Sequence, residues 1–193
     1  MTSPAEASFA TTTETELGSV SVRAAISPSE RRLSSARRES TNSCAPLSPT
    51  SDSAARADTR IKPVFRPANG HIARATNSAL DVATGEFVAL LDHDDLLPHD
   101  ALLHVAAAIA RRPSAGYLYT DEDKIDDAGR RFDPYFKTDF NLGLLRSHNY
   151  ACHFLAMERE LIRSIGGMRT GFDGAQDYDL VLRAVDRAQL VAG

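Results

Sequence analysis

The chain has 193 residues, a formal net charge of −4 and two cysteines. The negative charge makes nucleic acid an unexpected partner, and cysteines without CxxC spacing argue against a disulfide framework or a structural zinc site. Because the sequence has no signal-peptide pattern and no run of eighteen apolar residues, we expect no membrane span and a cytoplasmic location, with peripheral attachment to the inner face of the membrane left open.

The first 57 residues differ in composition from the rest of the chain. They contain 13 Ser, 7 Thr and 4 Pro, and Phe9 is the only one of the 13 aromatic residues that falls among them. Such a segment buries too little apolar surface to offset its ordering entropy. We therefore predict a low-complexity, disordered segment over residues 1–57 and a folded domain over residues 58–193.

The first half of the predicted domain alternates strands with helices. Residues 61–65 suggest a short strand, and Asn69-Gly70 a turn. Apolar residues then recur at i, i+3, i+4 and i+7 over 72–83, which indicates one buried helix face. The continuous apolar run 87–91 is typical of a strand covered on both faces in a mainly parallel sheet, and a second helix follows Pro98.

The second half continues this alternation to the end of the chain. We expect strands or extended segments at 117–120, 131–136 and 152–157, helical segments at 141–146 and 160–165, and a last helix with an apolar stripe from Tyr178 to Val185. Strands that alternate with helices predict an α/β layer architecture.

The strongest chemical signal is an acidic run at the end of the strand 87–91. Asp92, Asp94 and Asp95 stand where ligands of open α/β sheets bind, outside the carboxyl ends of the strands. Crowded carboxylates repel one another unless a cation lies among them, and oxygen ligands suit Mg²⁺ or Mn²⁺. The alternative is an acidic loop that caps the helix after Pro98.

A second carboxylate, Asp177, is the candidate general base. It lies in the first turn of the last helix, where the helix dipole favours an ionised carboxylate, behind a glycine-rich loop that leaves room for a substrate. The alternative is that Asp177 only caps its helix. A further acidic cluster, residues 121–123, either lines the same crevice or lies on a turn.

Five motifs in series resemble those of family 2 glycosyltransferases with the GT-A fold. They are NGHIARATN (69–77), GEFVALLDHDD (85–95), YTDED (119–123), GG (166–167) and GAQDYDLVLR (174–183). The resemblance covers about residues 58–187, in the order and spacing of the family. It implies a partial GT-A domain, with a Rossmann-like mixed sheet flanked by helices.

The resemblance also implies roles for individual residues. Asp92 and Asp94 would hold the metal, Mg²⁺ or Mn²⁺, and the diphosphate and ribose of the donor, with Asp94 as the main metal ligand, and Asp177 would be the catalytic base. The other positions implied near the donor are Asn69 and Asn77, beside the nucleotide, and Arg183, which serves the diphosphate or only pairs with Asp179 four residues before it. The candidate substrate contacts are His153, Asp95, Asp121, Asp123 and Gln176.

Part of the family pattern is missing from this sequence. Members usually begin with a strand and helix that form the pocket for the nucleotide base, and no such pattern is recognised in residues 1–57, although Arg23 to Ile26 resembles a fragment of the first helix. Members also usually continue past the last helix. We therefore expect a domain that is truncated at both ends.

The resemblance implies an inverting, metal-dependent glycosyltransferase. It would move a sugar from a nucleotide-diphosphate donor to a hydroxyl of a glycan or lipid-linked acceptor, in cell-surface polysaccharide or glycan synthesis. One alternative is an inactive fragment or binding remnant without a complete donor pocket. Another is a phosphohydrolase with Asp92 as nucleophile, but such enzymes usually have Gly-Thr after the Asp-x-Asp, where this chain has Asp95-Leu96.

Overall fold

The computed structural model describes residues 7–8, 15–17, 20–27, 61–92, 95–126, 128–188 and 190–193, with the backbone alone before residue 61. Its strands are β1 (Ala7–Ser8), β2 (Thr15–Leu17), β3 (Val20–Ser27), β4 (Val64–Phe65), β5 (Phe87–Asp92), β6 (Ala115–Tyr119), β7 (Glu122–Ile125), β8 (Arg131–Tyr135), β9 (Leu155–Glu158) and β10 (Leu190–Ala192). Its helices are α2 (His71–Val82), α3 (Ala101–Arg111), α4 (Leu142–Ser147), α5 (Arg159–Ser164) and α6 (Gln176–Arg187).

The main sheet has six strands in the order β10-β6-β9-β5-β3-β2. β5 is parallel to β3 and antiparallel to β9, and β6 is antiparallel to β9 and parallel to β10. The sheet is therefore mixed, as the predicted fold class required, although the apolar run of β5 by itself suggested mainly parallel neighbours. Two smaller sheets pair β1 with β4 and β7 with β8.

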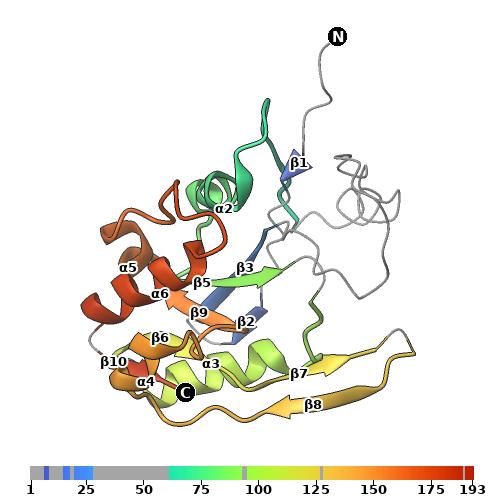
Figure 1. The fold of residues 1–193 in the computed structure, drawn as a ribbon, viewed down its shortest axis with the longest axis vertical. Helices are drawn as coiled ribbons and strands as arrows, with labels where there is room; N and C mark the ends of the chain where they lie inside the picture. The colour runs from blue at the N-terminus through green and yellow to red at the C-terminus, as the bar shows by residue number, and fades with distance from the viewer. Residues whose placement is uncertain are drawn as a thin grey trace.

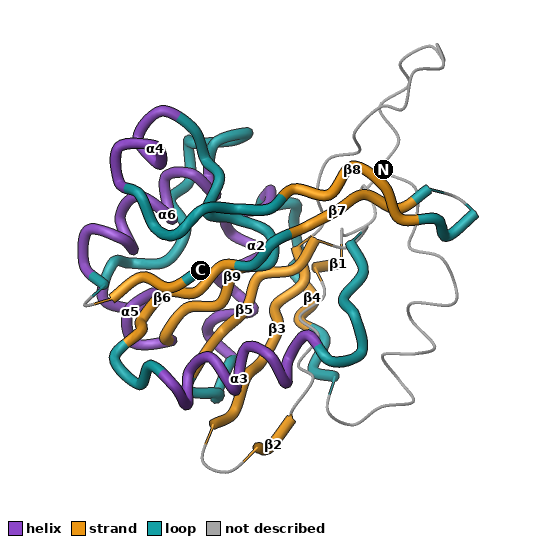
Figure 2. Tube along the Cα trace, turned by 90° about the horizontal axis from the view of Figure 1, so that it is seen from below, coloured by secondary structure: helices purple, strands orange, loops and turns teal. Residues whose placement is uncertain are grey.

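Helices cover both faces of this sheet (Figures 1 and 2). On one face Val88 of β5 joins a buried cluster with residues of α2, α5 and α6. Phe87 and Ala89 point to the other face, where they pack with Val105 and Ile109 of α3. The alternation along β5 explains its continuous apolar run, because each successive side chain enters a different core.

The N-terminal part of the chain contributes strands to the sheet. β3 runs parallel to β5 from Val22↔Phe87 to Ser27↔Asp92, and β2 adds to its outer edge. The prediction of a disordered segment over residues 1–57 did not include these strands. The resemblance of residues 23–26 to a helix fragment is wrong, because they lie within β3. The remaining residues of 1–60 lie outside the described part of the chain.

β9 begins later than predicted. The expected strand started at Cys152, but the structure places residues 151–154 in an irregular segment before Leu155. His153 has a φ of 30°, which a β-strand does not accommodate. This segment matters for the site because its side chains face the carboxyl end of β5.

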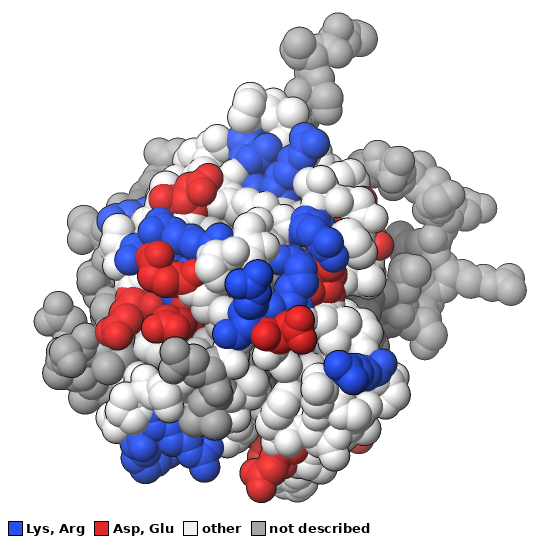
Figure 3. Space-filling model, turned by 90° about the vertical axis from the view of Figure 1, so that its left-hand side faces the viewer, with Lys and Arg blue, Asp and Glu red and all other residues white. Residues whose placement is uncertain are grey.

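Charged side chains of both signs are interleaved on the face shown in Figure 3. Among the ion pairs that the structure contains are those of Glu160 with Arg159 and Arg163. Of the helices that the structure describes, none has the length and apolarity that a bilayer crossing needs.

Candidate active site

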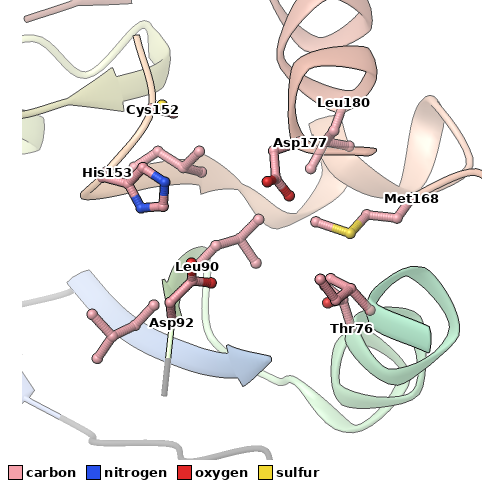
Figure 4. Close-up of a pocket in the computed structure, with 11 residues that line it drawn as sticks. Thr76, Leu90, Asp92, Cys152, His153, Met168, Asp177 and Leu180 are labelled. Carbon is pink, nitrogen blue, oxygen red and sulfur yellow. The ribbon is translucent and has the colours of Figure 1, made fainter. Parts of the chain in front are cut away.

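A pocket opens at the carboxyl end of β5, between this strand, α2 and the start of α6 (Figure 4). Asp177 points into it from α6, with Asp92 and His153 on one side and Thr76 and Met168 on the other. The residues that line it are Ile72, Thr76, Leu90, Leu91, Asp92, Cys152, His153, Leu155, Met168, Asp177 and Leu180. Three predicted site residues, Asp92, His153 and Asp177, thus meet in one pocket although they are far apart in the sequence.

One side of this site carries a group of possible metal ligands. Ligand atoms of Asp92, Asp95 and His153 all lie within 4.8 Å of one another. Two carboxylates and an imidazole form a donor set that fits a divalent transition-metal ion such as Mn²⁺. Asp94, the predicted main ligand, lies outside the described residues. We call the group of Asp92, Asp95 and His153 the metal-ligand cluster.

His153 is held close to acidic groups. Its Nδ1 lies 3.6 Å from Oδ2 of Asp95. This interaction raises the pKa of His153, burial opposes the rise, and the negative charge of Asp92 adds to it. Sequence analysis included His153 only as a substrate contact, because the distance between residues 92 and 153 in the chain hides their proximity.

Asp177 lies at the second position of α6 and is half-buried. Burial raises the pKa of its carboxyl group, and the neighbouring charge of His153 and a hydrogen bond from the Gln176 side chain act in the opposite direction. The helix start was expected to favour the ionised form, but burial is the larger influence here. A carboxylate with a raised pKa is a better proton acceptor wherever it remains ionised.

Two further groups in the pocket were missed by the sequence analysis as site residues. Thr76 has a relative exposure of 1%, and within the described structure its Oγ1 has no hydrogen-bond partner. Its place in the helical apolar pattern made it look like an ordinary core residue. Cys152 also lines the pocket, and burial raises the pKa of its thiol to about 11, so it remains protonated at neutral pH.

Arg183 contacts protein groups through all three guanidinium nitrogens. Nε and Nη2 bond to Asp179, Nη1 donates to the carbonyl of Ile165 at 2.7 Å, and Nη2 donates to that of Gly167 at 2.8 Å. Arg169 bonds to the same Asp179 carboxylate from the other side. Of the two predicted roles for Arg183, the geometry supports the pairing with Asp179, which ties α6 to the glycine-rich loop.

The two predicted asparagines also have protein partners. Asn69 Oδ1 accepts a hydrogen bond from His71 N at 2.8 Å, at the start of α2. Asn77 donates to Met168 O at 2.8 Å and accepts from Met168 N at 2.9 Å. The Asn77 side chain thus joins α2 to the loop that carries Met168, a residue of the pocket wall.

The acidic cluster at 121–123 lies at the start of the β7–β8 hairpin. Asp121 Oδ1 accepts from Lys137 N at 2.7 Å, and Glu122 lies 3.3 Å from Lys137 Nζ. Asp123 pairs with Arg131 at 2.6 Å. These carboxylates therefore hold the hairpin together, and none of the three lines the pocket. Gln176 does not line it either; it is 5% exposed beside Asp177, and its Oε1 has no partner among the described residues.

Comparisons with known proteins match this chain to a protein family and to sequence relatives. Residues 48–166 match the model of the family described as "Glycosyl transferase family 2". The chain is 50% identical over 132 residues to the uncharacterized protein y4gI of Sinorhizobium fredii, and 45% identical over 130 residues to the O-antigen biosynthesis protein RfbC of Myxococcus xanthus. These matches cover 68% and 67% of this chain but only 14% and 10% of the two relatives.

Solved structures share the fold. Residues 1–349 of TarS from S. aureus match with a TM-score of 0.59 and 20% identity, over 74% of this chain and 43% of that one. The same protein in complex with UDP-GlcNAc matches with a TM-score of 0.60 and 18% identity, over 76% of this chain and 43% of that one. At this level of identity the likeness shows the arrangement of the sheet and helices.

Proposed function

This chain belongs to glycosyl transferase family 2, as its motifs predicted, and we propose that it transfers a sugar from a nucleotide-diphosphate donor to a hydroxyl acceptor. The GT-A fold that the same motifs predicted is confirmed by the likeness to TarS. The relative named for O-antigen biosynthesis supports a role in polysaccharide synthesis, and we propose a glycan or lipid-linked molecule as the acceptor. The observation that carries the proposal is that Asp92 and Asp177 line one pocket.

In this proposal Asp177 is the general base. As the acceptor oxygen forms its bond to the anomeric carbon, its proton passes to the Asp177 carboxylate, and the bond from that carbon to the donor diphosphate breaks with its electron pair on the diphosphate. Asp177 approaches the pocket from α6, while Asp92 lies at the end of β5. Attack from the side of Asp177 on a donor held at Asp92 inverts the anomeric centre.

The metal-ligand cluster is the proposed site of the cation. Asp92, Asp95 and His153 would hold it, together with Asp94 by family resemblance. A divalent ion there supplies charge neutralisation for the departing diphosphate. An imidazole ligand suits Mn²⁺ better than Mg²⁺, which prefers oxygen ligands, so Mn²⁺ is the ion to test first.

Thr76 is added to the proposal as a donor contact. A buried hydroxyl without a partner costs free energy that a bonded one does not, and the Thr76 hydroxyl lies in the wall of the pocket between α2 and α6. A polar atom of the nucleotide sugar would give it the missing hydrogen bond. Arg183 and Asn77 would act indirectly, through the loop between residues 165 and 168 that they hold.

The experiment is a screen of nucleotide sugars with the whole 193-residue chain, in which release of nucleoside diphosphate is measured with and without Mn²⁺. We expect Mn²⁺-dependent release with at least one donor, and a product of inverted anomeric configuration by NMR. Calorimetric titration with nucleoside diphosphates and Mn²⁺ accompanies the screen. The absence of heat at millimolar ligand would contradict the proposal and favour a binding remnant or inactive fragment.

A further inference from the structure

Lys137 has a buried side chain whose ammonium group bonds to the main chain of two residues that line the pocket. Its side chain has a relative exposure of 1%, whereas lysines are almost never fully buried unless they are paired. It lies two residues after β8, at the returning end of the hairpin. A buried charge of this kind needs a specific set of partners, and the structure shows them.

The partners of the Lys137 ammonium are three acceptors. Nζ donates to the carbonyl oxygens of Cys152 and His153, and it lies 3.3 Å from Oε2 of Glu122. An ammonium has three N–H donors, so each donor has an acceptor. The Tyr135 ring, with its centroid 5.8 Å from Nζ, adds a cation–π contact.

The segment that receives these hydrogen bonds is the irregular turn before β9. His153 has a φ of 30°, in the left-handed region that histidine adopts only occasionally. A turn of this kind persists only where its surroundings hold it. On its other side Phe154 is held by Thr120, whose Oγ1 accepts from Phe154 N at 3.2 Å and whose N donates to Phe154 O at 3.1 Å.

We propose that Lys137 is a positioning residue: its ammonium holds the main chain of Cys152 and His153 so that the His153 imidazole faces Asp92 and Asp95 in the metal-ligand cluster. The inference rests on the proposed function, since it assigns a metal to that cluster. The inference also assigns a role to Glu122 of the acidic hairpin, because its carboxylate supplies the negative charge that pairs with the buried ammonium.

The test compares Lys137→Met with Lys124→Met. Lys124 lies in the same hairpin, where it pairs with Asp133, but its side chain is 63% exposed, and among the described residues none of its bonds reaches the pocket segment. The whole chain is labelled with ¹⁵N-histidine, and Mn²⁺ alone is titrated in. Paramagnetic broadening then reports which of the six histidines lies near the ion, and His153→Gln identifies the resonance of His153.

We expect broadening of the His153 resonance in the wild-type protein and in Lys124→Met at similar Mn²⁺ concentrations. Groups that orient metal ligands typically contribute tenfold to a hundredfold in metal affinity. The Mn²⁺ concentration at half-maximal broadening should therefore be at least about tenfold higher in Lys137→Met than in the wild type. A purely structural lysine would lower thermal stability without moving this midpoint in folded protein. A folded Lys137→Met with the wild-type midpoint would overturn the inference.

Three further outcomes of the experiment each have a definite meaning. If Lys137→Met does not fold, Lys137→Gln takes its place: its shorter side chain loses at least one hydrogen bond, which predicts about twofold to tenfold weaker binding, and an unchanged midpoint overturns the inference. If no wild-type histidine broadens at millimolar Mn²⁺, the metal site of the proposed function fails and the inference falls with it. Equal broadening in the wild type and in both Lys137 variants would overturn the inference about Lys137 but would leave the proposed metal site standing.

Discussion

The chain contains two acidic clusters that follow β5 and β6, two strands that β9 separates in the main sheet, and the structure gives the clusters different surroundings. In the hairpin, Asp121, Glu122 and Asp123 bond to the main chain or side chains of Lys137 and Arg131. At the end of β5, Asp92 and Asp95 gather with His153, whose charge depends on pH. The first cluster is paired with lysine and arginine side chains, whereas the second is the site at which we propose that a metal ion binds.

This difference shows why a count of carboxylates does not identify a site. Both clusters follow a buried strand, and the sequence analysis left it open whether residues 121–123 share the crevice of Asp92. Permanently charged lysine and arginine side chains neutralise the hairpin acids within the fold. In the pocket, the half-buried Asp177 lies near the titratable His153, which is the arrangement that catalytic groups typically have.

The largest expected effect tests the pocket directly. Asp177→Asn removes the proton acceptor while preserving the shape of the side chain, so turnover should fall about 10²-fold to 10⁴-fold. Binding of nucleoside diphosphate with Mn²⁺ should change little. Because burial raises the pKa of Asp177 above the usual value of 3.8, wild-type activity should rise with pH through this raised pKa, since only the ionised form accepts a proton.

The matched control is Asp173→Asn, an exposed aspartate in the glycine-rich loop just before α6. It should retain wild-type turnover. Equal losses of activity in the two variants, or a loss of binding in Asp177→Asn that matches its loss of turnover, would contradict the role of Asp177 as a base.

The next effect contrasts the two acidic clusters. Asp92→Ala should weaken Mn²⁺-dependent binding of nucleoside diphosphate by about tenfold to a hundredfold, as expected for a metal ligand or a group that orients one. Asp123→Ala loses only the pair with Arg131 in the hairpin and should bind as the wild type does. Calorimetry measures both. If the two variants lost affinity equally, the distinction between the clusters would not hold.

Most of the fold could be predicted because the helices and strands after residue 60 have clear apolar periods. The helix predicted over 72–83 is α2 (His71–Val82), and the apolar run 87–91 is β5. β3 escaped prediction because it lies in a Ser-rich composition, although Val20, Val22 and Ile26 alternate as in a strand. Averaging over the first 57 residues hid this local pattern.

The site was predictable in part, for a physical reason. Asp92 and Asp177 stand at element ends, where sequence motifs and topology both point to a ligand. The metal-ligand role that we propose for His153 depends on the irregular turn to which Lys137 bonds, and the role proposed for the Thr76 hydroxyl depends on which face of α2 meets the pocket. Both features arise from tertiary contacts that no local pattern encodes.

Asp177 can also be compared with Asp179, a second carboxylate in the same turn of α6. Asp179 lies two residues after Asp177, is 7% exposed and bonds to Arg169 and Arg183, so Asp179→Asn should lower the free energy of unfolding by about 2 kcal/mol. Arg169 and Arg183 hold the pKa of Asp179 below 3.8. A lowered folded-state pKa stabilises above the unfolded-state pKa, and this contribution is lost as the pH falls through the folded value.

Urea unfolding from pH 7 down to pH 3 measures this effect. The difference between the wild type and Asp179→Asn should be full at neutral pH and should shrink below about pH 4, near the usual aspartate pKa. Asp177→Asn, in contrast, should not destabilise the protein at neutral pH, because burial disfavours the ionised form of that carboxyl group. A pH-independent difference for Asp179→Asn would show that packing, not ion pairing, explains its effect.

The smallest expected effect concerns an uncharged group in the same pocket. Thr76→Val keeps the shape of the side chain and removes a buried hydroxyl that has no partner among the described residues, so the free energy of unfolding should rise by about 1 kcal/mol. If that hydroxyl bonds to the donor, the affinity for a nucleotide sugar should fall by about twofold to tenfold in the same variant. Chemical denaturation and calorimetry measure the two quantities.

A rise in stability together with a fall in donor affinity distinguishes a residue that contacts the ligand from an ordinary core residue. Thr76→Ser, which keeps the hydroxyl but loses a methyl group, should do the reverse: it should lower stability and retain more of the donor affinity than Thr76→Val does. If Thr76→Val is more stable than the wild type and binds the donor equally well, the proposal that the Thr76 hydroxyl contacts the donor is wrong. A Val variant that is less stable would mean that the hydroxyl is bonded to water in the unliganded protein, since only a satisfied group stabilises the fold.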